Sequence, residues 1–409
     1  MLASRAQPLP FRSAPAVAAV GANLGRVAVA LAPAGAPAEG HPVVLEGRTS
    51  THLETALDGA SGLAIARAYL GDVAVATVGT HAISVRVQRW FGGGFQRALS
   101  IPIGAGAVSS LTVTLDYRSD VLVAWQQNGS IYAHMLRASG LPQKTQHVGA
   151  SGPEPLLRAL VSDNNHGMLA WSSTEGSGAS ARTRIELAFS AAGVRFFAPT
   201  PLAEFADPLG SGRMPESLAL VRLSTENVLL AWTAREAGRY VVRAAPALFA
   251  ATRPSALLSG SAEDAVLEDL ATGPEGEAVA LWRPFGSSAQ FSQHAQLWSA
   301  RVLIDRGDRP VASAARIIAS TGAVADASVA VDPATDAALA AWRVGSAGTR
   351  VEFALGAGAG RYRPRIAVVP APQGGGTHWL RIALAALALL ALALGAGLLR
   401  ARARRRAAR

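Results

Sequence analysis

The chain has 409 residues, of which half are hydrophobic and 16% are charged, a composition that supports a large core and argues against global disorder. It contains no cysteine, which excludes disulfide bonds, thiolate catalysis and cysteine-ligated metal sites. The formal net charge is +10, but seven arginines lie at or after Arg381, and without them the charge falls to +3. The basic charge therefore belongs to the C-terminal tail and argues against a nucleic-acid partner.

Residues 1–12 form an N-terminal segment that precedes the first predicted strand. An exported domain needs a signal peptide, yet Arg26 interrupts the apolar stretch that would form its hydrophobic region, and residues 25–33 fit a strand better. We expect that the start at Met1 is misassigned and that a signal peptide is encoded upstream. An atypical signal within these residues is the alternative.

An apolar run that ends in Ala-Trp, or in a close variant of it, recurs along residues 13–370. The tryptophans that close the run are Trp125, Trp171, Trp232, Trp282 and Trp342. Two degenerate copies precede them, with Leu31 and Thr77 in the tryptophan position. Successive positions are 46 to 61 residues apart, a period that is typical of repeated four-stranded units.

Each unit contains the same predicted parts in the same order. An alternating strand such as residues 110–115 comes first, followed by a turn rich in Asp, Asn and Gly and then by the Ala-Trp strand. A third strand such as residues 131–136 comes next, and the remainder has room for a fourth. A sheet with two apolar faces cannot cover both alone, so we expect the units to stack in a ring with the tryptophans buried between them.

This pattern resembles the β-propeller superfamily, and in particular Ala-Trp-repeat surface proteins of uncharacterised function from GC-rich bacteria. The resemblance implies an all-β fold with a single β-propeller over residues 13–370. Seven repeat positions favour seven blades, and six would follow if the first unit were only a partial blade. Because propellers host binding, scaffolding and catalysis alike, the resemblance implies no particular activity.

The C-terminal region reads as a membrane anchor. A Gly-rich linker over residues 371–378 precedes a predicted transmembrane helix at 379–399, whose last 18 residues are uncharged and mainly apolar, about 27 Å of helix. Trp379 suits the membrane interface, and the Arg-rich tail at 400–409 should stay cytoplasmic by the positive-inside rule. This predicts a single-pass cell-membrane protein with an extracytoplasmic propeller. A buried core helix and a processed sorting signal are the alternatives.

Four connections are longer than the others, at residues 172–182, 198–216, 283–295 and 305–323. In an up-and-down sheet the second-to-third and fourth-to-first connections emerge on the same face, so these segments should gather on one side of the ring. We predict a ligand-binding surface there that includes Arg182, Phe205, Asp207, Arg213, Arg283, Phe285, Phe291 and His294. The alternative is that they are surface loops without a binding role.

The sequence spells out no catalytic motif. It has no serine within Gly-x-Ser-x-Gly and no phosphate-binding loop, and its eight histidines are scattered without a pair at metal-ligand spacing. We therefore predict no catalytic residues, no metal and no cofactor, although a site assembled from distant blades would escape such a search.

These features favour a membrane-anchored, extracytoplasmic propeller that acts as a non-catalytic binding or scaffold module for a surface glycan or a protein ligand. A propeller-type glycan hydrolase or lyase with its site at the central channel is the first alternative, and carboxylates clustered at the channel mouth would favour it. A cytoplasmic, tail-anchored interaction hub is the second.

Overall fold

The computed structural model describes residues 16–370 with gaps. The longest gaps cover residues 33–42, 53–61, 90–95, 207–217 and 285–295. In the part of the chain that is described, no helix has the length and apolar character needed to cross a bilayer. The predicted anchor at 379–399 and the linker and tail beside it lie outside the described residues.

The described chain is all β, and its strands form seven antiparallel sheets that follow one another along the sequence. Four sheets have four strands each. They are β1 (Ala16–Asn23), β2 (Arg26–Ala32), β3 (Val43–Glu46) and β4 (Thr49–His52); β5 (Gly62–Arg67), β6 (Val73–Val78), β7 (Ala82–Gln88) and β8 (Leu99–Pro102); β9 (Val108–Leu115), β10 (Val121–Gln127), β11 (Ser130–Leu136) and β12 (Gln146–Ala150); and β28 (Val324–Asp332), β29 (Ala337–Val344), β30 (Arg350–Ala357) and β31 (Arg361–Pro370).

The other three sheets have five strands, because in each of them two strands instead of one pair with the outer edge of the third strand. They are β13 (Leu157–Val161), β14 (Gly167–Glu175), β15 (Arg182–Ala191), β16 (Arg195–Phe196) and β17 (Thr200–Ala206); β18 (Leu218–Arg222), β19 (Val228–Glu236), β20 (Arg239–Leu248), β21 (Ala251–Thr252) and β22 (Ala256–Leu257); and β23 (Ala265–Thr272), β24 (Ala278–Pro284), β25 (Gln296–Ile304), β26 (Pro310–Ala312) and β27 (Arg316–Ala319).

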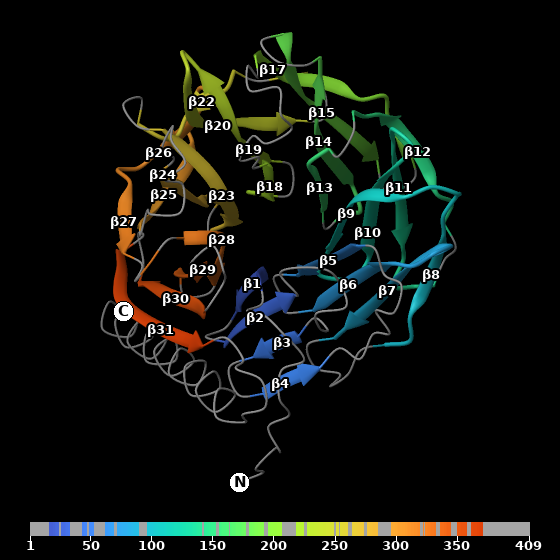
Figure 1. Ribbon diagram of the computed structural model, residues 1–409, viewed down its shortest axis with the longest axis horizontal. Coiled ribbons are helices and arrows are strands. Elements are labelled where there is room, and N and C mark those ends of the chain that lie inside the picture. Colours follow the sequence, from blue (N-terminus) through green and yellow to red (C-terminus); the bar gives the residue numbers. More distant parts are fainter. Residues whose placement is uncertain are drawn as a thin grey trace.

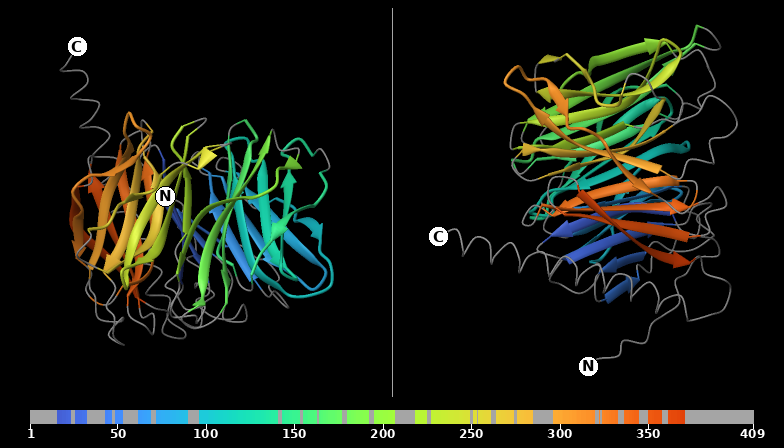
Figure 2. Two further views of the ribbon diagram at one scale, coloured as in Figure 1. Left: turned by 90° about the horizontal axis from the view of Figure 1, so that it is seen from above. Right: turned by 90° about the vertical axis from the view of Figure 1, so that its left-hand side faces the viewer.

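The sheets are arranged around a common centre. The first strand of each sheet contacts the first strand of the next one, from β5 through β9, β13, β18 and β23 to β28. β28 contacts β1, and β1 contacts β5, so the series closes on itself. Figure 1 shows these first strands innermost and the later strands of each sheet toward the rim, and Figure 2 shows the strands running between the two faces of the ring.

Each sheet carries one repeat position on its second strand. The seven positions are Leu31 on β2, Thr77 on β6, Trp125 on β10, Trp171 on β14, Trp232 on β19, Trp282 on β24 and Trp342 on β29. The five tryptophans are between 0% and 3% exposed. These second strands read as continuous apolar runs because they are buried on both faces, as the burial of every residue of β10 shows.

The Ala-Trp pair has a simple geometric meaning. Successive side chains of a strand point to opposite faces of its sheet. Trp171 packs against Leu122 and Ala133 of the preceding sheet, whereas Ala170 packs against Leu218 of the following sheet. The large side chain thus fills one interface and the small one lets the next sheet approach closely. Trp232 and Trp282 likewise face the preceding sheet.

Hydrogen bonds reinforce the innermost layer between two neighbouring sheets. The register of β23 shifts between Leu267 and Asp269. The carboxylate of Asp269 accepts hydrogen bonds from the Ser328 hydroxyl (2.7 Å) and from the Val329 amide (2.9 Å), both on β28. The neighbouring Glu268 accepts from the Ala327 amide (3.0 Å) and pairs with Arg283. At the bulge in β23, the carboxylates of Glu268 and Asp269 therefore bind β28 by hydrogen bonds, in addition to the apolar contacts between the two sheets.

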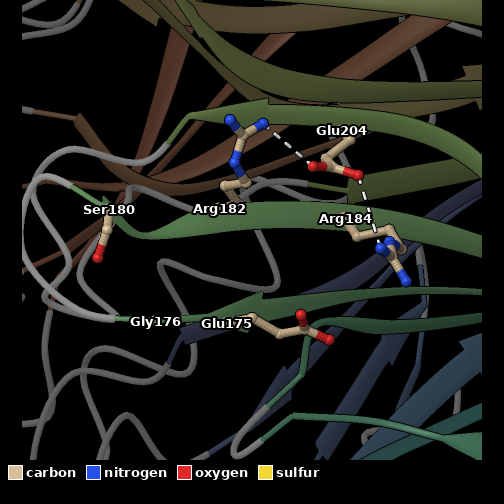
Figure 3. A pocket seen from close by; sticks show the side chains of 6 residues that line it. All are labelled: Glu175, Gly176, Ser180, Arg182, Arg184 and Glu204. Carbon is tan, nitrogen blue, oxygen red and sulfur yellow. Dashed lines mark hydrogen bonds and ion pairs between the residues drawn. The ribbon is translucent and has the colours of Figure 1, made fainter.

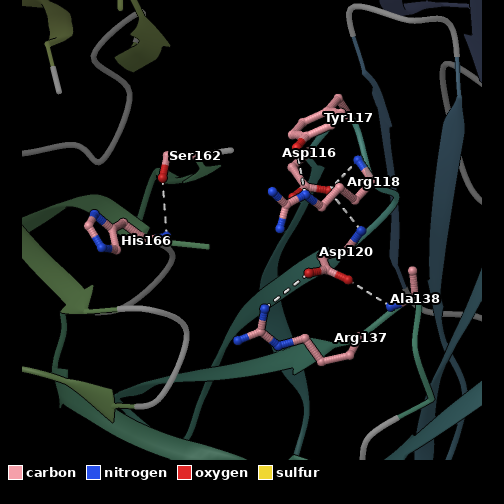
Figure 4. Close-up of polar contacts among 8 residues, drawn as sticks. All are labelled: Asp116, Tyr117, Arg118, Asp120, Arg137, Ala138, Ser162 and His166. Carbon is pink, nitrogen blue, oxygen red and sulfur yellow. Dashed lines mark hydrogen bonds and ion pairs between the residues drawn. The ribbon is translucent and has the colours of Figure 1, made fainter. Parts of the chain in front are cut away.

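The turns between first and second strands are organised by their own side chains (Figure 4). Asp116 accepts hydrogen bonds from the amides of Arg118 (2.8 Å) and Asp120 (2.9 Å). Ser162 closes the corresponding turn in the next sheet, because its hydroxyl accepts from the His166 amide at 3.1 Å. His166 therefore lies in a backbone turn, where polar residues are common.

Candidate functional site

The second-to-third and fourth-to-first connections meet on one face of the ring, which we call the hairpin face. At the tip of the β10–β11 hairpin, Gln127 donates to the carbonyls of Gly104 and Gly106 (both 2.8 Å), and Asn128 donates to that of Ala105 (2.9 Å). Residues 103–107 connect β8 to β9. The two kinds of connection therefore contact each other across neighbouring sheets.

A pocket of about 180 Å³ opens where β14 and β15 meet on this face (Figure 3). It is lined by Glu175, Gly176, Ser180, Arg182, Arg184 and Glu204. The charged side chains all come from strands: β14 supplies one, β15 supplies the two arginines and β17 supplies the last. Strand positions hold side chains more rigidly than loop positions do.

Within this pocket one carboxylate is held between two guanidinium groups. Glu204 lies 3.2 Å from Arg182 and 3.6 Å from Arg184. The register explains the arrangement, because Arg184 is directly opposite Glu204 and Arg182 is two residues along the same face of β15. The side chains are 66%, 42% and 42% exposed for Arg182, Arg184 and Glu204, so the pairs contribute little stability and mainly fix orientation.

The second carboxylate of the pocket, that of Glu175, is available to accept hydrogen bonds. Glu175 is opposite Arg182 in the β14–β15 register and is exposed, and its carboxylate forms no hydrogen bond or ion pair with any described residue. The chain turns away directly afterwards at Gly176, whose φ is +83°. A Cβ at this position would lie 3.0 Å from the Ser180 carbonyl oxygen, so glycine is needed for the turn. Glu175 can therefore accept hydrogen bonds from a ligand.

A further cation lies on the same face of the next sheet. The Arg235 guanidinium carbon is 5.5 Å from the centroid of the Tyr240 ring, within the range of a cation–π interaction. Its Nε and Nη1 atoms are buried and have no hydrogen-bond acceptor among the described residues. Tyr240 also packs against Phe205, which follows Glu204 on β17.

The structure places three of the eight predicted ligand-binding residues. Arg182 lines the pocket. Phe205 follows Glu204 on β17 but is partly buried against Tyr240 and Val266. Arg283 lies on β24, pairs with Glu268 and does not line the pocket. The other five lie outside the described residues: Asp207, Arg213, Phe285, Phe291 and His294.

Sequence reasoning missed Glu175, Arg184 and Glu204. The arginines two residues apart at the start of β15 carried a usable signal, because a period of two places both side chains on one face of a strand. Glu204 carried none, since its place opposite Arg184 depends on how β17 returns to pair with β15. Among the described residues, no group of three histidines, aspartates or glutamates is placed to hold a metal ion.

No protein-family model and no curated protein matches the sequence. Solved structures do resemble the fold. A puromycin-hydrolyzing peptidase from Mycobacterium tuberculosis matches 87% of this chain at 12% identity with a TM-score of 0.50, and this chain spans 55% of that protein. The fold is that of a β-propeller. This likeness shows the fold alone, because the identity is far below the level at which an activity can be carried over.

Two other similar structures also come from proteases. The β-propeller domain of the Trilobed protease from Pyrococcus furiosus matches 87% of this chain at 7% identity, with a TM-score of 0.47 and 95% of that domain covered. Oligopeptidase B from Trypanosoma brucei matches 90% of this chain at 11% identity, with a TM-score of 0.48. This chain spans half of that enzyme, so a large part of the enzyme has no counterpart in the match.

Proposed function

We propose that this protein is a seven-bladed β-propeller that acts as a non-catalytic binding module, anchored in the cell membrane with the propeller outside the cytoplasm. The blade count is supported by the seven sheets, the repeat position in each one and the contact between β28 and β1. The binding role rests on one observation. In the pocket on the hairpin face, the carboxylate of Glu175, which has no ion-pair partner among the described residues, lies beside the ion-paired Arg182, Glu204 and Arg184.

The chemistry of the pocket favours a glycan over a peptide as its ligand. Glu175 offers acceptors, and the arginines keep N–H groups that their single contacts with Glu204 do not use. A sugar ring carries several hydroxyls, each able to donate to a carboxylate and to accept from a guanidinium. A volume of about 180 Å³ suits one sugar ring. A polysaccharide would therefore bind along the hairpin face, with one of its sugar residues inserted into the pocket.

Replacing Glu175 with Gln is expected to weaken glycan binding about tenfold or more, because the amide loses the charge-assisted acceptor for sugar hydroxyls. The measurement is isothermal titration calorimetry with a glycan selected from an array of bacterial surface polysaccharides. Glu186→Gln is the matched control, since Glu186 lies on β15 outside the pocket and its replacement should leave binding unchanged. The absence of any retained glycan, or equal affinity of Glu175→Gln and the unaltered protein, would contradict the proposal; retention of basic peptides alone would favour a protein ligand.

The membrane placement is tested by protease treatment of intact cells. We expect proteinase K to degrade the propeller, followed with an antibody against it, while a tag fused after Arg409 stays protected until the cells are permeabilised. This result follows from the positive-inside rule applied to residues 400–409. Protection of the propeller in intact cells would instead support a cytoplasmic, tail-anchored protein.

A further inference from the structure

The lining of the pocket on the hairpin face is polar throughout. Its side chains are those of two arginines, two glutamates and one serine, and the sixth residue is Gly176. Among the described residues that line it, none is aromatic or aliphatic, so a sugar ring finds no apolar surface to stack on. Most small-molecule pockets are lined mainly by apolar side chains with a few polar groups. Affinity in this pocket must therefore come from ion pairs and charge-assisted hydrogen bonds, which favours a ligand that carries a charge.

The position that an anionic ligand would take is already filled by Glu204. Each oxygen of its carboxylate lies near one arginine: Oε1 is 3.2 Å from Nη1 of Arg182, and Oε2 is 3.6 Å from Nη2 of Arg184. Figure 3 shows this carboxylate between the two guanidinium groups. An anion that approached the arginines would lie close to Glu204, and Glu175 stands opposite Arg182 on the neighbouring strand. Like charges at such distances repel, so the pocket disfavours uronate and phosphate groups.

Glu175 is the carboxylate of the pocket that has no counter-ion among the described residues. It is the last residue of β14, is exposed and is directly opposite Arg182, whose guanidinium contacts Glu204 instead. In Figure 3 the Glu175 carboxylate lies apart from the two ion pairs. An ionised carboxylate only accepts hydrogen bonds, and it accepts them most strongly from a charged donor. The charge that the pocket leaves uncompensated therefore calls for a cation.

We propose that the pocket binds an amino sugar in its unacetylated form, with the ammonium group of the sugar paired to Glu175. This inference rests on the proposed glycan-binding role and names the class of sugar. Hydroxyls of the same ring accept hydrogen bonds from the N–H groups of Arg182 and Arg184 that Glu204 does not use. A lysine side chain of a peptide would satisfy Glu175 but offers the arginines no acceptor.

The pocket also distinguishes a free amine from an acetylated one. N-acetylation removes the charge of the amino group, so the ion pair with Glu175 is lost. It also adds bulk at the nitrogen, whereas a volume of about 180 Å³ suits a single sugar ring. Both effects act against an N-acetylated sugar.

The test compares a glucosamine tetramer with an N-acetylglucosamine tetramer by isothermal titration calorimetry, using the full chain in a non-ionic detergent at about 0.15 M salt. We expect the glucosamine tetramer to bind about fivefold more tightly or better, because it alone can pair with Glu175. Glu175→Gln should reduce this ratio to below about twofold, and its circular dichroism spectrum should be unchanged because the side chain is exposed. Glu186→Gln, outside the pocket, should leave the ratio unchanged. Tetralysine should bind at least about fivefold more weakly than the glucosamine tetramer.

Equal or tighter binding of the N-acetylglucosamine tetramer would overturn the inference and leave the glycan-binding role intact. A preference for the free amine that persists in Glu175→Gln would place the ammonium group elsewhere and would overturn it as well. Tetralysine that binds as tightly as the glucosamine tetramer would show that the pocket recognises an amine without its sugar. If neither tetramer binds although another glycan is retained from the array, the sugar class alone is wrong. If no glycan is retained, the proposed function fails together with this inference.

Discussion

Replacing Trp171 with Ala is expected to lower the free energy of unfolding by about 3–5 kcal/mol. The indole is fully buried between two sheets, where it contacts apolar side chains of β10 and β11. The side chains around it belong to different strands of a closed ring, so they cannot collapse into the cavity without moving a whole sheet. The loss should therefore lie in the upper part of the range for large-to-small core substitutions.

The measurement for this variant is the midpoint of chemical unfolding followed by tryptophan fluorescence and circular dichroism. Phe197→Ala serves as the control, because Phe197 is 58% exposed and its loss should change the stability by less than about 0.5 kcal/mol. A Trp171→Ala protein as stable as this control would show that the Ala-Trp strands do not form the core between the sheets.

Replacing Asp269 with Ala is expected to destabilise the protein by about 2–4 kcal/mol. The substitution removes the acceptor for the Ser328 hydroxyl and the Val329 amide, and it leaves both groups without that partner beside the centre of the ring. Since β28 also contacts β1 where the ring closes, loosening its attachment to β23 weakens the closure. Ser328→Ala is the matched control, because it removes one donor and leaves no buried carboxylate unpaired, and it should cost less than half as much. Equal stability of Asp269→Ala and the unaltered protein would contradict this role.

The same carboxylate predicts a pH dependence with a defined sign. Burial raises the pKa of Asp269 above its ordinary value of 3.8, although three hydrogen bonds and Arg158 act in the opposite direction. The folded protein therefore holds this proton more tightly than the unfolded chain does. The stabilising contribution of protonation is fully present below the unfolded pKa and is lost as the pH rises through the folded pKa.

Comparing the unfolding midpoints of the unaltered protein and Asp269→Asn from about pH 3.5 to about pH 7 checks this sign. The stability of the unaltered protein relative to Asp269→Asn should decrease as the pH rises. A relative stability that increases with pH would show that the hydrogen bonds to Asp269 outweigh its burial, and that the pKa is lowered in the folded protein.

Much of the architecture could be predicted from local patterns. The predicted strands over residues 110–115 and 131–136 coincide closely with β9 and β11, and each of the seven repeat positions lies on the second strand of a sheet. These features depend on which residues alternate and which form continuous apolar runs, and such patterns are set by near neighbours in the chain. The split of the outer strand into β16 and β17 left no comparable pattern, because few positions of these two strands are buried.

The candidate site was predicted only in part, for a related reason. Arg182 could be named because it lies at the end of a long connection. Arg283 was named on the same ground, yet its side chain turns to Glu268, since the bulge in β23 places that carboxylate within reach. Connection length indicates where a binding surface can form, but it does not specify which side chains meet there.

The sequence by itself determined the repeat and the burial of large apolar side chains on the second strands, because composition and short-range periodicity are sufficient for these inferences. The membrane anchor stays a prediction from the sequence, since residues 379–399 lie outside the described part of the chain. Only the tertiary structure decided that Glu204 lies between two arginines and that Asp269 on β23 accepts hydrogen bonds from Ser328 and Val329 on β28. The first depends on strand register, and the second joins residues about 60 positions apart on neighbouring sheets. Neither contact can be predicted from the short-range pattern of the sequence, since each depends on how strands pair and how whole sheets pack against one another.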